Sequence, residues 1–212
     1  MTRDSQATKQ RILDAAHDLF LRQGFAATSL DRVLEQAEVT KGAFFHHFDS
    51  KLALGEQVME RFLEADRALL DEVMNKAEAL ASDPLQQVLV VIGLLRDLLS
   101  ESGAAEAGCL IAAYCYQEEL MTPRVRQWTA DEMRAWRQRL ADKLRAAARL
   151  HPPRTAVDPE VLADHVNTVV EGAFVMAKTF GDPSILPRQL ELVRTHLALL
   201  FDAPLPSPRG GA

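Results

Sequence analysis

The chain has 212 residues, 48% of them hydrophobic, a composition that supports a folded core and argues against intrinsic disorder. Its formal net charge of −6 argues at first sight against binding to nucleic acid. The longest apolar run, residues 88–95, is too short to cross a bilayer, and residues 1–6 lack the apolar segment of a secretory signal. We therefore expect a cytoplasmic protein with no membrane partner.

About nine helices are expected, because no segment alternates for long with the period of two that marks a strand. Capping residues mark several helix starts, among them Ser50, Asp83 and Asp158. In chain order the expected helices cover residues 5–23, two short stretches within 30–48, then 50–81, 84–102, 104–121 (one helix or a broken pair), 122–150, 158–181 and 187–201. The predicted fold class is all-α.

The segment Leu30–Lys51 carries the most specific pattern. Its first helix keeps an apolar face at spacing i, i+3, i+4, i+7, formed by Leu30, Val33, Leu34 and Ala37. Thr28 precedes it, and Asp31 three residues later completes a pattern similar to a capping box. Thr40 is a second N-cap candidate and opens residues 41–48. Two short capped helices joined by three or four residues predict a helix-turn-helix that places its second helix in a DNA major groove.

Charge is distributed unevenly between this region and the remainder of the chain. Residues 1–55 contain seven basic and seven acidic side chains, so this part is neutral and the remainder holds the whole negative excess. Helix N-termini and a few lysines bind phosphates without a basic domain. The neutral charge of this N-terminal region predicts weak non-specific DNA binding with a modest dependence on salt.

A run of residues carries a resemblance to a known family. The run continues from a recognition helix into the next helix start, and consists of Lys41, Gly42, Ala43, Phe44, Phe45, His46, His47, Phe48, Asp49, Ser50, Lys51 and Leu54. With upstream matches at residues 12–16, 19–20, 24–25 and 27–29, it resembles the DNA-binding head of the TetR/AcrR family of one-component transcriptional regulators. One position departs from the family pattern: a tyrosine whose hydroxyl can reach a phosphate is commonly found where this chain has Phe45, so that contact passes to His46 or is absent.

The resemblance implies a division of the chain and a set of DNA contacts. Residues 1–50 would form a three-helix DNA-binding head, residues 51–203 a larger helical body for ligand binding and dimerisation, and residues 204–212 a disordered tail. The expected DNA-binding residues are Thr28, Ser29, Thr40, Lys41, Gly42, Phe45, His46, His47 and Lys51. Thr28 and Lys51 would hold phosphates at two helix starts. The long helix from Ser50 is expected to pack on both parts and to transmit movement between them.

The last two expected helices look more apolar than one packed face requires. In the resembling family this pair forms a four-helix interface with its copy in a homodimer, whose two heads bind a palindromic operator in double-stranded DNA. The expected interface residues are Val166, Val169, Val170, Ala173, Phe174, Leu190, Val193, Leu197 and Leu200. The alternative is that both stripes serve the core of a single chain.

The resemblance also implies a pocket for a small-molecule effector among the middle helices of the body. Polar side chains expected to point into it are Tyr114, Tyr116, Glu118, Asn167, Glu171 and Lys178. Asn167, Glu171 and Lys178 share one helical face, although a solvent-facing polar stripe has the same spacing. Nothing in these residues names the effector.

Cys109 is a candidate sensor. Gly108-Cys109-Leu110 near a helix start would place the thiol close to the positive end of the backbone dipole, which favours thiolate. Some members of the resembling family with a similar segment respond to electrophiles or oxidants through that cysteine, and Lys178 could assist if its helix lies nearby. A small buried side chain is the alternative for Cys109 and the expectation for Cys115. The two lie six apart and point to different sides of a helix, so they are not expected to pair.

The expected function is a ligand-responsive repressor, released from its operator by a small molecule or by modification of Cys109. Nothing in these residues excludes an activator, so the direction of regulation rests on the resemblance alone. No paired carboxylates, glycine-rich phosphate loop or metal-ligand cluster argue for an enzyme, and no cofactor is expected. The adjacent His46 and His47 diverge on a helix, so they are not expected to share a metal. The alternatives are a helical small-molecule-binding module without DNA selectivity and, less favoured, an enzyme.

Overall fold

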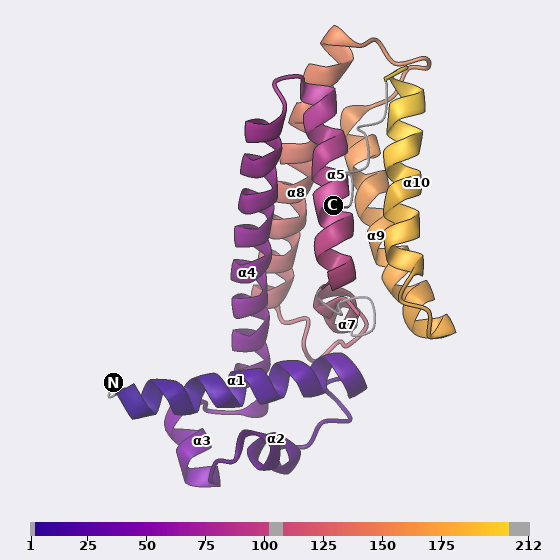
Figure 1. Ribbon diagram of the computed structural model, residues 1–212. Helices are drawn as coiled ribbons and strands as arrows, with labels where there is room; N and C mark the ends of the chain where they lie inside the picture. The colour runs from indigo at the N-terminus through magenta and orange to yellow at the C-terminus, as the bar shows by residue number, and fades with distance from the viewer. Residues whose placement is uncertain (1–2, 102–107, 204–212) are drawn as a thin grey trace, which may run out of the picture. The chain divides into compact units, whose positions relative to one another are not determined.

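The computed structural model describes residues 3–101 and 108–203. In this part of the chain the regular structure consists of helices joined by turns and loops, and there is no strand. In chain order (Figure 1) the helices are α1 (Arg3–Gln23), α2 (Leu30–Ala37), α3 (Lys41–His47), α4 (Lys51–Leu80), α5 (Pro84–Glu101), α7 (Leu110–Cys115), α8 (Pro123–Leu150), α9 (Pro159–Phe180) and α10 (Ile185–Leu200). The all-α prediction is confirmed. Within the described ranges, every helix is too short or too polar to span a membrane.

Local capping chemistry fixes most of the helix starts. Ser50 Oγ accepts a hydrogen bond from the N–H of Ala53 at 3.0 Å, and Asp83 Oδ1 accepts from Gln86 N–H at 3.0 Å. Asp158 Oδ1 likewise accepts from the N–H of Glu160 at 2.8 Å. Each cap satisfies a backbone donor that has no partner inside the first helical turn. The three capping predictions are confirmed.

Two predicted helices differ from the structure. The last begins at Ile185 rather than near Pro187, because the first turn needs no intrahelical donors and tolerates a proline. Of the helix expected over residues 104–121, the described residues form only the six-residue α7 and then turns. Pro123 disfavours helical backbone at the residue before it, which separates these turns from α8.

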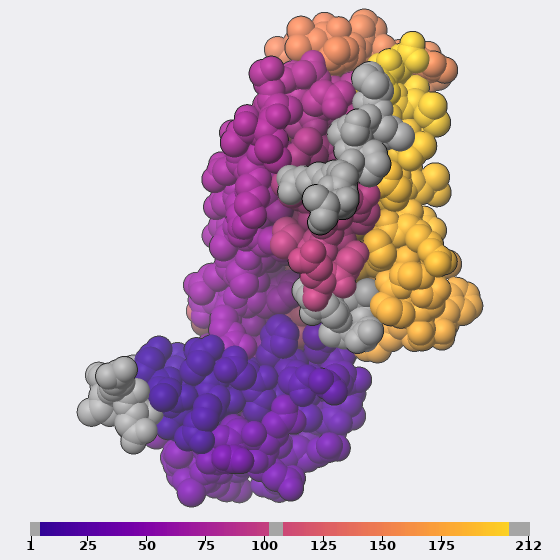
Figure 2. Space-filling view, viewed as in Figure 1, coloured from indigo at the N-terminus to yellow at the C-terminus, as the bar shows by residue number. Residues whose placement is uncertain are grey.

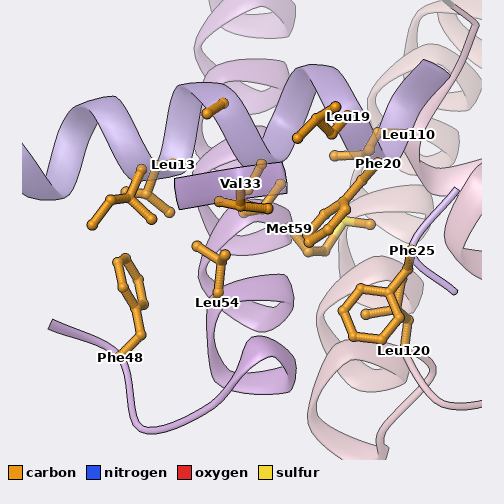
Figure 3. Close-up of a cluster of buried hydrophobic side chains, with 14 of the residues drawn as sticks. Leu13, Leu19, Phe20, Phe25, Val33, Phe48, Leu54, Met59, Leu110 and Leu120 are labelled. Carbon is orange, nitrogen blue, oxygen red and sulfur yellow. The ribbon is translucent and has the colours of Figure 1, made fainter. Parts of the chain in front are cut away.

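The chain divides into two compact units, and neither is a continuous stretch of sequence. The first takes residues 1–66 and 107–131. Its core joins buried residues of α1, α2, α3 and the first half of α4 to Leu110 and Tyr114 of α7 and to Leu120 and Val125 beyond it. Figure 3 shows Leu110 near Phe20 in this cluster, and Leu120 near Phe25.

The second unit takes residues 67–106 and 132–212. Helix α5 is its buried element, as predicted, with six buried apolar residues: Leu85, Val88, Leu89, Val91, Ile92 and Leu95. Helix α10 packs against both α5 and α9, and α9 and α10 lie side by side in the orange-to-yellow part of Figure 2. Ion pairs join α8 to α4, including Lys143 with Glu78 at 2.7 Å.

This division cuts the chain at different points from the predicted head and body. Its boundaries fall inside α4, after residue 66, and inside α8, after residue 131. The compact units are defined by packing, whereas the predicted domains are defined by function. The domain limits at residues 50 and 203 therefore remain predictions. The expected tail, residues 204–212, lies outside the described residues.

Candidate nucleic-acid interface

The turn between α2 and α3 is built from local backbone and capping contacts. Ser29 Oγ accepts from the N–H of Arg32 at 3.2 Å and begins α2. Glu38 ends α2 in the left-handed region, at φ 54°, and its N–H donates to Glu35 O at 3.1 Å. Thr40 Oγ1 then accepts from Ala43 N–H at 3.2 Å and begins α3. These contacts form the predicted helix-turn-helix, with Thr40 confirmed as the second cap.

Helix α3 is fixed by aromatic residues on its inner side. Phe44 and Phe48 are buried, and their rings stack with centroids 5.4 Å apart. Figure 3 places Phe48 near Leu13 of α1 and Leu54 of α4, within the core of the first unit. The prediction that Phe44 and Phe48 belong to the core is confirmed, and α3 is held rigidly because its anchors are packed on several helices.

The other side of α3 is open to solvent. Lys41, Gly42, Phe45 and His46 are exposed, and His47 is half-buried. We call these five residues the reading edge. Phe45 is 49% exposed and meets the ring of Phe44 edge to face at 5.2 Å, so a large apolar surface stands among polar neighbours.

The surroundings of His47 disfavour the charged form of its ring. The rings of His46 and His47 lie 4.9 Å apart. Partial desolvation, followed by the positive charges of His46 and Lys9, lowers the pKa of His47 below its ordinary value of 6.5. His47 is therefore neutral at pH 7, and binding by this edge depends on hydrogen bonds and apolar contacts more than on its charge. Among the described residues there is no cluster of three or more metal-ligating side chains.

Thr28 does not have the role expected from the sequence. Its side chain is fully buried, its hydroxyl donates to Gly24 O at 2.7 Å and accepts from Gln23 Nε2 at 3.1 Å. Ser29, the next residue, caps α2 instead, so the capping box predicted from Thr28 is wrong. Two adjacent hydroxyl residues both fit the cap pattern, and only the backbone geometry separates them.

Lys51 also has a partner within its own unit. Its ammonium donates to Phe25 O at 2.6 Å and lies 3.9 Å from the centroid of the Phe25 ring. Burial lowers the pKa of Lys51, against the opposing charge of Glu119. The side chain that was expected to hold a phosphate thus braces the turn between α1 and α2.

The predicted sensor segment begins at the N-cap of α7. Cys109 is half-buried and makes no side-chain capping hydrogen bond. Because α7 has only six residues, it offers a thiolate a smaller dipole than a full helix would. Cys115 is exposed, contrary to the expectation that it belongs to the core. Lys178 is exposed on α9 and lies in the other compact unit.

The tyrosines expected in the effector pocket point in opposite directions. Tyr114 is buried, and its hydroxyl donates to Gly55 O at 2.9 Å, while burial raises its pKa. Tyr116 is 88% exposed and Glu118 is exposed, so the prediction that they face an interior is wrong. Residues two apart on a helix differ by about 200°, and this explains why both tyrosines cannot face inward. On α9, Asn167 and Glu171 are half-buried.

Sequence reasoning missed one buried carboxylate in the second unit. Glu132 on α8 is fully buried, and its Oε2 accepts from Arg67 Nε at 3.0 Å and Nη2 at 2.5 Å. Its Oε1 has no hydrogen-bond partner among the described residues. The spacing was visible beforehand, since Glu132 lies four residues after Trp128 and four before Trp136, on the stripe expected to face inward.

The apolar surface of α9 and α10 differs from the predicted interface. Most of the predicted residues are buried within one chain: Val166, Ala173, Phe174, Leu190, Val193 and Leu197. Val169, Val170 and Leu200 are half-buried. A second set is exposed, and we call it the outer apolar face: Val161, Val175, Met176, Phe180, Leu192 and Leu199. Helix α10 packs against α5 and α9 of its own chain, and this packing explains the correction.

A groove of about 470 Å³ runs along the same two helices. It is lined by His165, Val169, Gln189, Leu192, Val193, Thr195, His196 and Leu199. The rings of His165 and His196 meet edge to face, with centroids 5.8 Å apart. The groove shares Leu192 and Leu199 with the outer apolar face, so the two surfaces overlap on α10.

Comparisons with known proteins agree with this architecture. A family profile described as "Bacterial regulatory proteins, tetR family" matches residues 12–58. A second, described as "Tetracyclin repressor-like, C-terminal domain", matches residues 84–193, more than half of the chain. The HTH-type transcriptional repressor DhaR of Mycobacterium sp. (strain GP1) is 24% identical over 199 residues, covering 94% of this chain and 93% of DhaR.

Other relatives match in part or in fold. The HTH-type transcriptional repressor NemR of Escherichia coli (strain K12) is 37% identical over 71 residues, 34% of this chain and 36% of NemR. The solved structure of E. coli NemR in its reduced form has a TM-score of 0.71 at 24% identity and covers 93% of this chain and 99% of that one. A TetR regulator from Chloroflexus aurantiacus J-10-FL has a TM-score of 0.76 at 20% identity, over 93% and 97% of the two chains. This chain therefore belongs to the TetR family and is a helix-turn-helix, DNA-binding transcriptional regulator.

Proposed function

We propose that the protein is a homodimeric, cytoplasmic repressor that binds a palindromic operator and is released by a small molecule or by modification of Cys109. The observation that carries the DNA-binding part is the reading edge of α3, exposed above the buried pair Phe44 and Phe48. A rigid helix with one open side is what insertion into a major groove requires. In this proposal the protein has no catalytic activity.

Four of the five residues of the reading edge have a defined role in this proposal. Lys41, with Thr40 at the start of α3, lies where a helix N-terminus meets a base edge or a phosphate. Phe45 supplies apolar contact, for which a thymine methyl group is a suitable partner. His46 and His47 approach the sugar-phosphate backbone as hydrogen-bonding groups, and the lowered pKa of His47 favours its neutral form. Lys41→Ala should reduce the salt dependence of operator binding by about 0.9 units of log K per log [salt].

Lys51 gives a matched comparison for that salt measurement. Because its ammonium already bonds Phe25 O at 2.6 Å, Lys51→Ala should change the salt dependence less than Lys41→Ala. Binding isotherms for both variants across a salt series decide this. A slope change of the same size for both would return Lys51 to the phosphate-binding set that the sequence predicted.

The dimer is proposed to form through the outer apolar face and the adjoining groove. Four of the six exposed side chains are on α9 and two on α10, and water contact at this surface is unfavourable. A second copy of the same surface can cover it with twofold symmetry. Two heads then bind half-sites about one DNA turn apart, which gives affinity that one helix-turn-helix lacks.

The effector site is proposed to lie in the interior of the second unit. Glu132 Oε1 is buried without a hydrogen-bond partner among the described residues, and a buried acceptor of this kind favours a ligand that donates a hydrogen bond. Asn167 and Glu171, half-buried on α9, remain candidates for further polar contacts. The effector changes operator affinity only to the extent that it binds the two states of the protein differently.

The thiol route is proposed for Cys109, with Cys115 as its natural control. Cys109 is half-buried at the N-cap of α7, next to Leu110 in the core of the first unit, whereas Cys115 is exposed at the other end. A group added at Cys109 must displace packed neighbours, while one added at Cys115 projects into solvent. The similarity to NemR, whose structure is known in a reduced form, supports this choice.

The test is fluorescence anisotropy of the full chain on the DNA that flanks its own gene, with a scrambled duplex as control and with or without N-ethylmaleimide. Wild-type protein and Cys115→Ser should bind selectively and lose binding on alkylation, and Cys109→Ser should keep binding. If all three keep binding after alkylation, the thiol route is wrong and a reversible effector remains. If no DNA from a genome-wide selection is preferred, the protein is instead a binding module without DNA selectivity.

A further inference from the structure

A single side chain beyond α7 holds the turn between α1 and α2. Gln117 Oε1 accepts hydrogen bonds from Phe25 N–H at 2.8 Å and from Ala26 N–H at 3.2 Å. The other end of the same amide, Nε2, donates to Ala113 O at 2.9 Å and so ties back to α7. One amide group therefore connects α7 to two backbone donors in the turn.

The turn is fixed from its other side as well. Lys51 Nζ donates to Phe25 O at 2.6 Å, and the Thr28 hydroxyl donates to Gly24 O at 2.7 Å. Gly24 has φ +84°, a backbone conformation that favours glycine, and its position faces the Gln117 amide. Four hydrogen bonds made by three side chains, together with one left-handed residue, define the shape of the turn, and Gln117 accepts two of the four.

Apolar contacts bring the segment 110–120 into the same core. Leu110 and Leu120 are buried with α1 and α4 residues in the cluster shown in Figure 3. Tyr114 donates to Gly55 O, and a Cβ at Gly55 would lie 2.7 Å from Leu120 Cδ2. The segment is thus part of the packed core of the DNA-binding head, although in the sequence it lies far from that head.

The shape of the turn determines how the reading edge is presented. Helices α2 and α3 are joined by three residues and capped at both starts, so they move together. The chain enters α2 from α1 through residues 24–29, and α2 and α3 also pack directly against α1. N–H···O hydrogen bonds in proteins span about 2.7–3.2 Å, so a small displacement of Gln117 weakens both of its contacts with the turn.

We infer that Gln117 is a positioning residue of the DNA-binding head, which couples α7 to the α1–α2 turn and thereby sets the affinity for the operator. A signal that displaces α7, including modification of Cys109 at its start, reaches α2 and α3 through this amide. The inference rests on the proposed function, and it adds a second route to the one predicted along α4. Coupling of this kind requires that the turn be better held in the DNA-bound state than in the released state.

The experiment uses the full chain and four variants. Gln117→Met keeps the length of the side chain and removes the acceptor, whereas Gln117→Glu keeps the acceptor for the two turn amides. Gln117→Asn retains an amide that is one methylene too short. The matched control is Gln127→Met on α8, where the exposed glutamine bonds Asp131 in its own helix at 2.9 Å.

Two readouts are compared: operator binding by anisotropy against a scrambled duplex, and amide hydrogen exchange at Phe25 and Ala26. Gln117→Met should weaken operator binding about tenfold, a typical size for coupling between sites, with a smaller effect on scrambled DNA. It should also speed exchange at the two amides. Gln117→Glu should retain most of the operator affinity, and Gln127→Met should behave as wild type in both readouts.

Gln117→Met that binds the operator as tightly as wild type, with faster exchange at Phe25 and Ala26, would overturn the positioning role. Unchanged exchange would show that the amide does not hold the turn. If circular dichroism shows that Gln117→Met is unfolded, Gln117→Asn decides by the same criteria. Wild-type protein that selects no DNA would remove the proposed function and this inference together, whereas selective wild type with an unaffected Gln117→Met removes this inference alone.

Discussion

Two short helices in the same compact unit, α3 and α7, use their sides in opposite ways. Helix α3 has seven residues, a side-chain cap at Thr40, and one face open to solvent. Helix α7 has six residues, begins at Cys109 without a side-chain cap, and buries Leu110 and Tyr114 in the core. A local cap holds α3 in shape so that its outer face is free to bind. Helix α7 is held by residues far away in the sequence, so changes in those residues can alter its position.

The largest expected effect is on the anchor of α3. Phe44→Ala should lower the free energy of unfolding by about 3–5 kcal/mol, because it leaves a cavity beneath the reading edge. Urea denaturation followed by circular dichroism measures this. The neighbouring Phe45→Ala is the control and should cost less than about 1 kcal/mol, since that ring is 49% exposed. Equal losses for the two variants would mean that α3 is not anchored as described.

The next effect is on the packing of the segment after α7, which contains Leu120. Gly55→Ala should destabilise the protein by about 1–3 kcal/mol, because its Cβ would lie 2.7 Å from Leu120 Cδ2 and 3.3 Å from Phe25 Cε2. Gly93→Ala on α5 is the same change in another helix, and its nearest neighbour is Arg194 Nη1 at 3.8 Å. That control should be stabilising by about 0.5–1 kcal/mol. If both variants stabilise the protein, the packing around Gly55 adjusts easily to the added methyl group.

A smaller effect tests the capping difference itself. Thr40→Ala should cost about 1 kcal/mol because Ala43 N–H loses its acceptor, while Thr40→Ser should be nearly neutral. Cys109→Ser should stay within about 0.5 kcal/mol of wild type, since Cys109 makes no capping hydrogen bond. Thermal unfolding of the three variants is sufficient. A loss at Cys109→Ser as large as at Thr40→Ala would remove the contrast between the helices.

The smallest expected effect is a pH dependence of the reading edge. The pKa of His47 is lowered, first by desolvation and then by the charges of His46 and Lys9, so the ring is neutral at pH 7. As the pH falls below 6.5, protonation adds positive charge near the phosphates, and operator affinity should rise. Titration of binding between pH 5 and about pH 8 measures this. His47→Gln should flatten the rise more than substitution of the half-buried His17 on α1 does, or the assignment is wrong.

The features that were predicted correctly are those whose sequence signals lie within a few neighbouring residues. The caps at Thr40, Ser50 and Asp158 and the anchors Phe44 and Phe48 were predicted correctly, because the cap and the helical period lie within a few neighbouring residues. Thr28 was assigned wrongly because its neighbour also carries a hydroxyl. Local patterns therefore fix the helix-turn-helix and leave only the choice between adjacent candidates.

Features that depend on distant contacts could not be predicted. The apolar stripe of α10 was assigned to a dimer, yet Leu190, Val193 and Leu197 pack on their own chain, and the period alone cannot tell which of two apolar faces a neighbour covers. Gln117 gave no signal, since its partners Phe25 and Ala26 lie more than 90 positions away. Glu132 is an exception, because a polar residue on an apolar stripe can be recognised in the sequence.

The split composition of the first compact unit bears on how heads and bodies of this family can be exchanged. A chimaera joined at residue 50 or 58 transfers α1, α2 and α3 but leaves behind residues 107–131, which complete their core. Leu110, Tyr114, Leu120 and the Gln117 amide would then come from a protein that evolved with a different head. Successful exchange should require the graft to carry both segments, so the inheritable module for operator recognition in this chain is discontinuous.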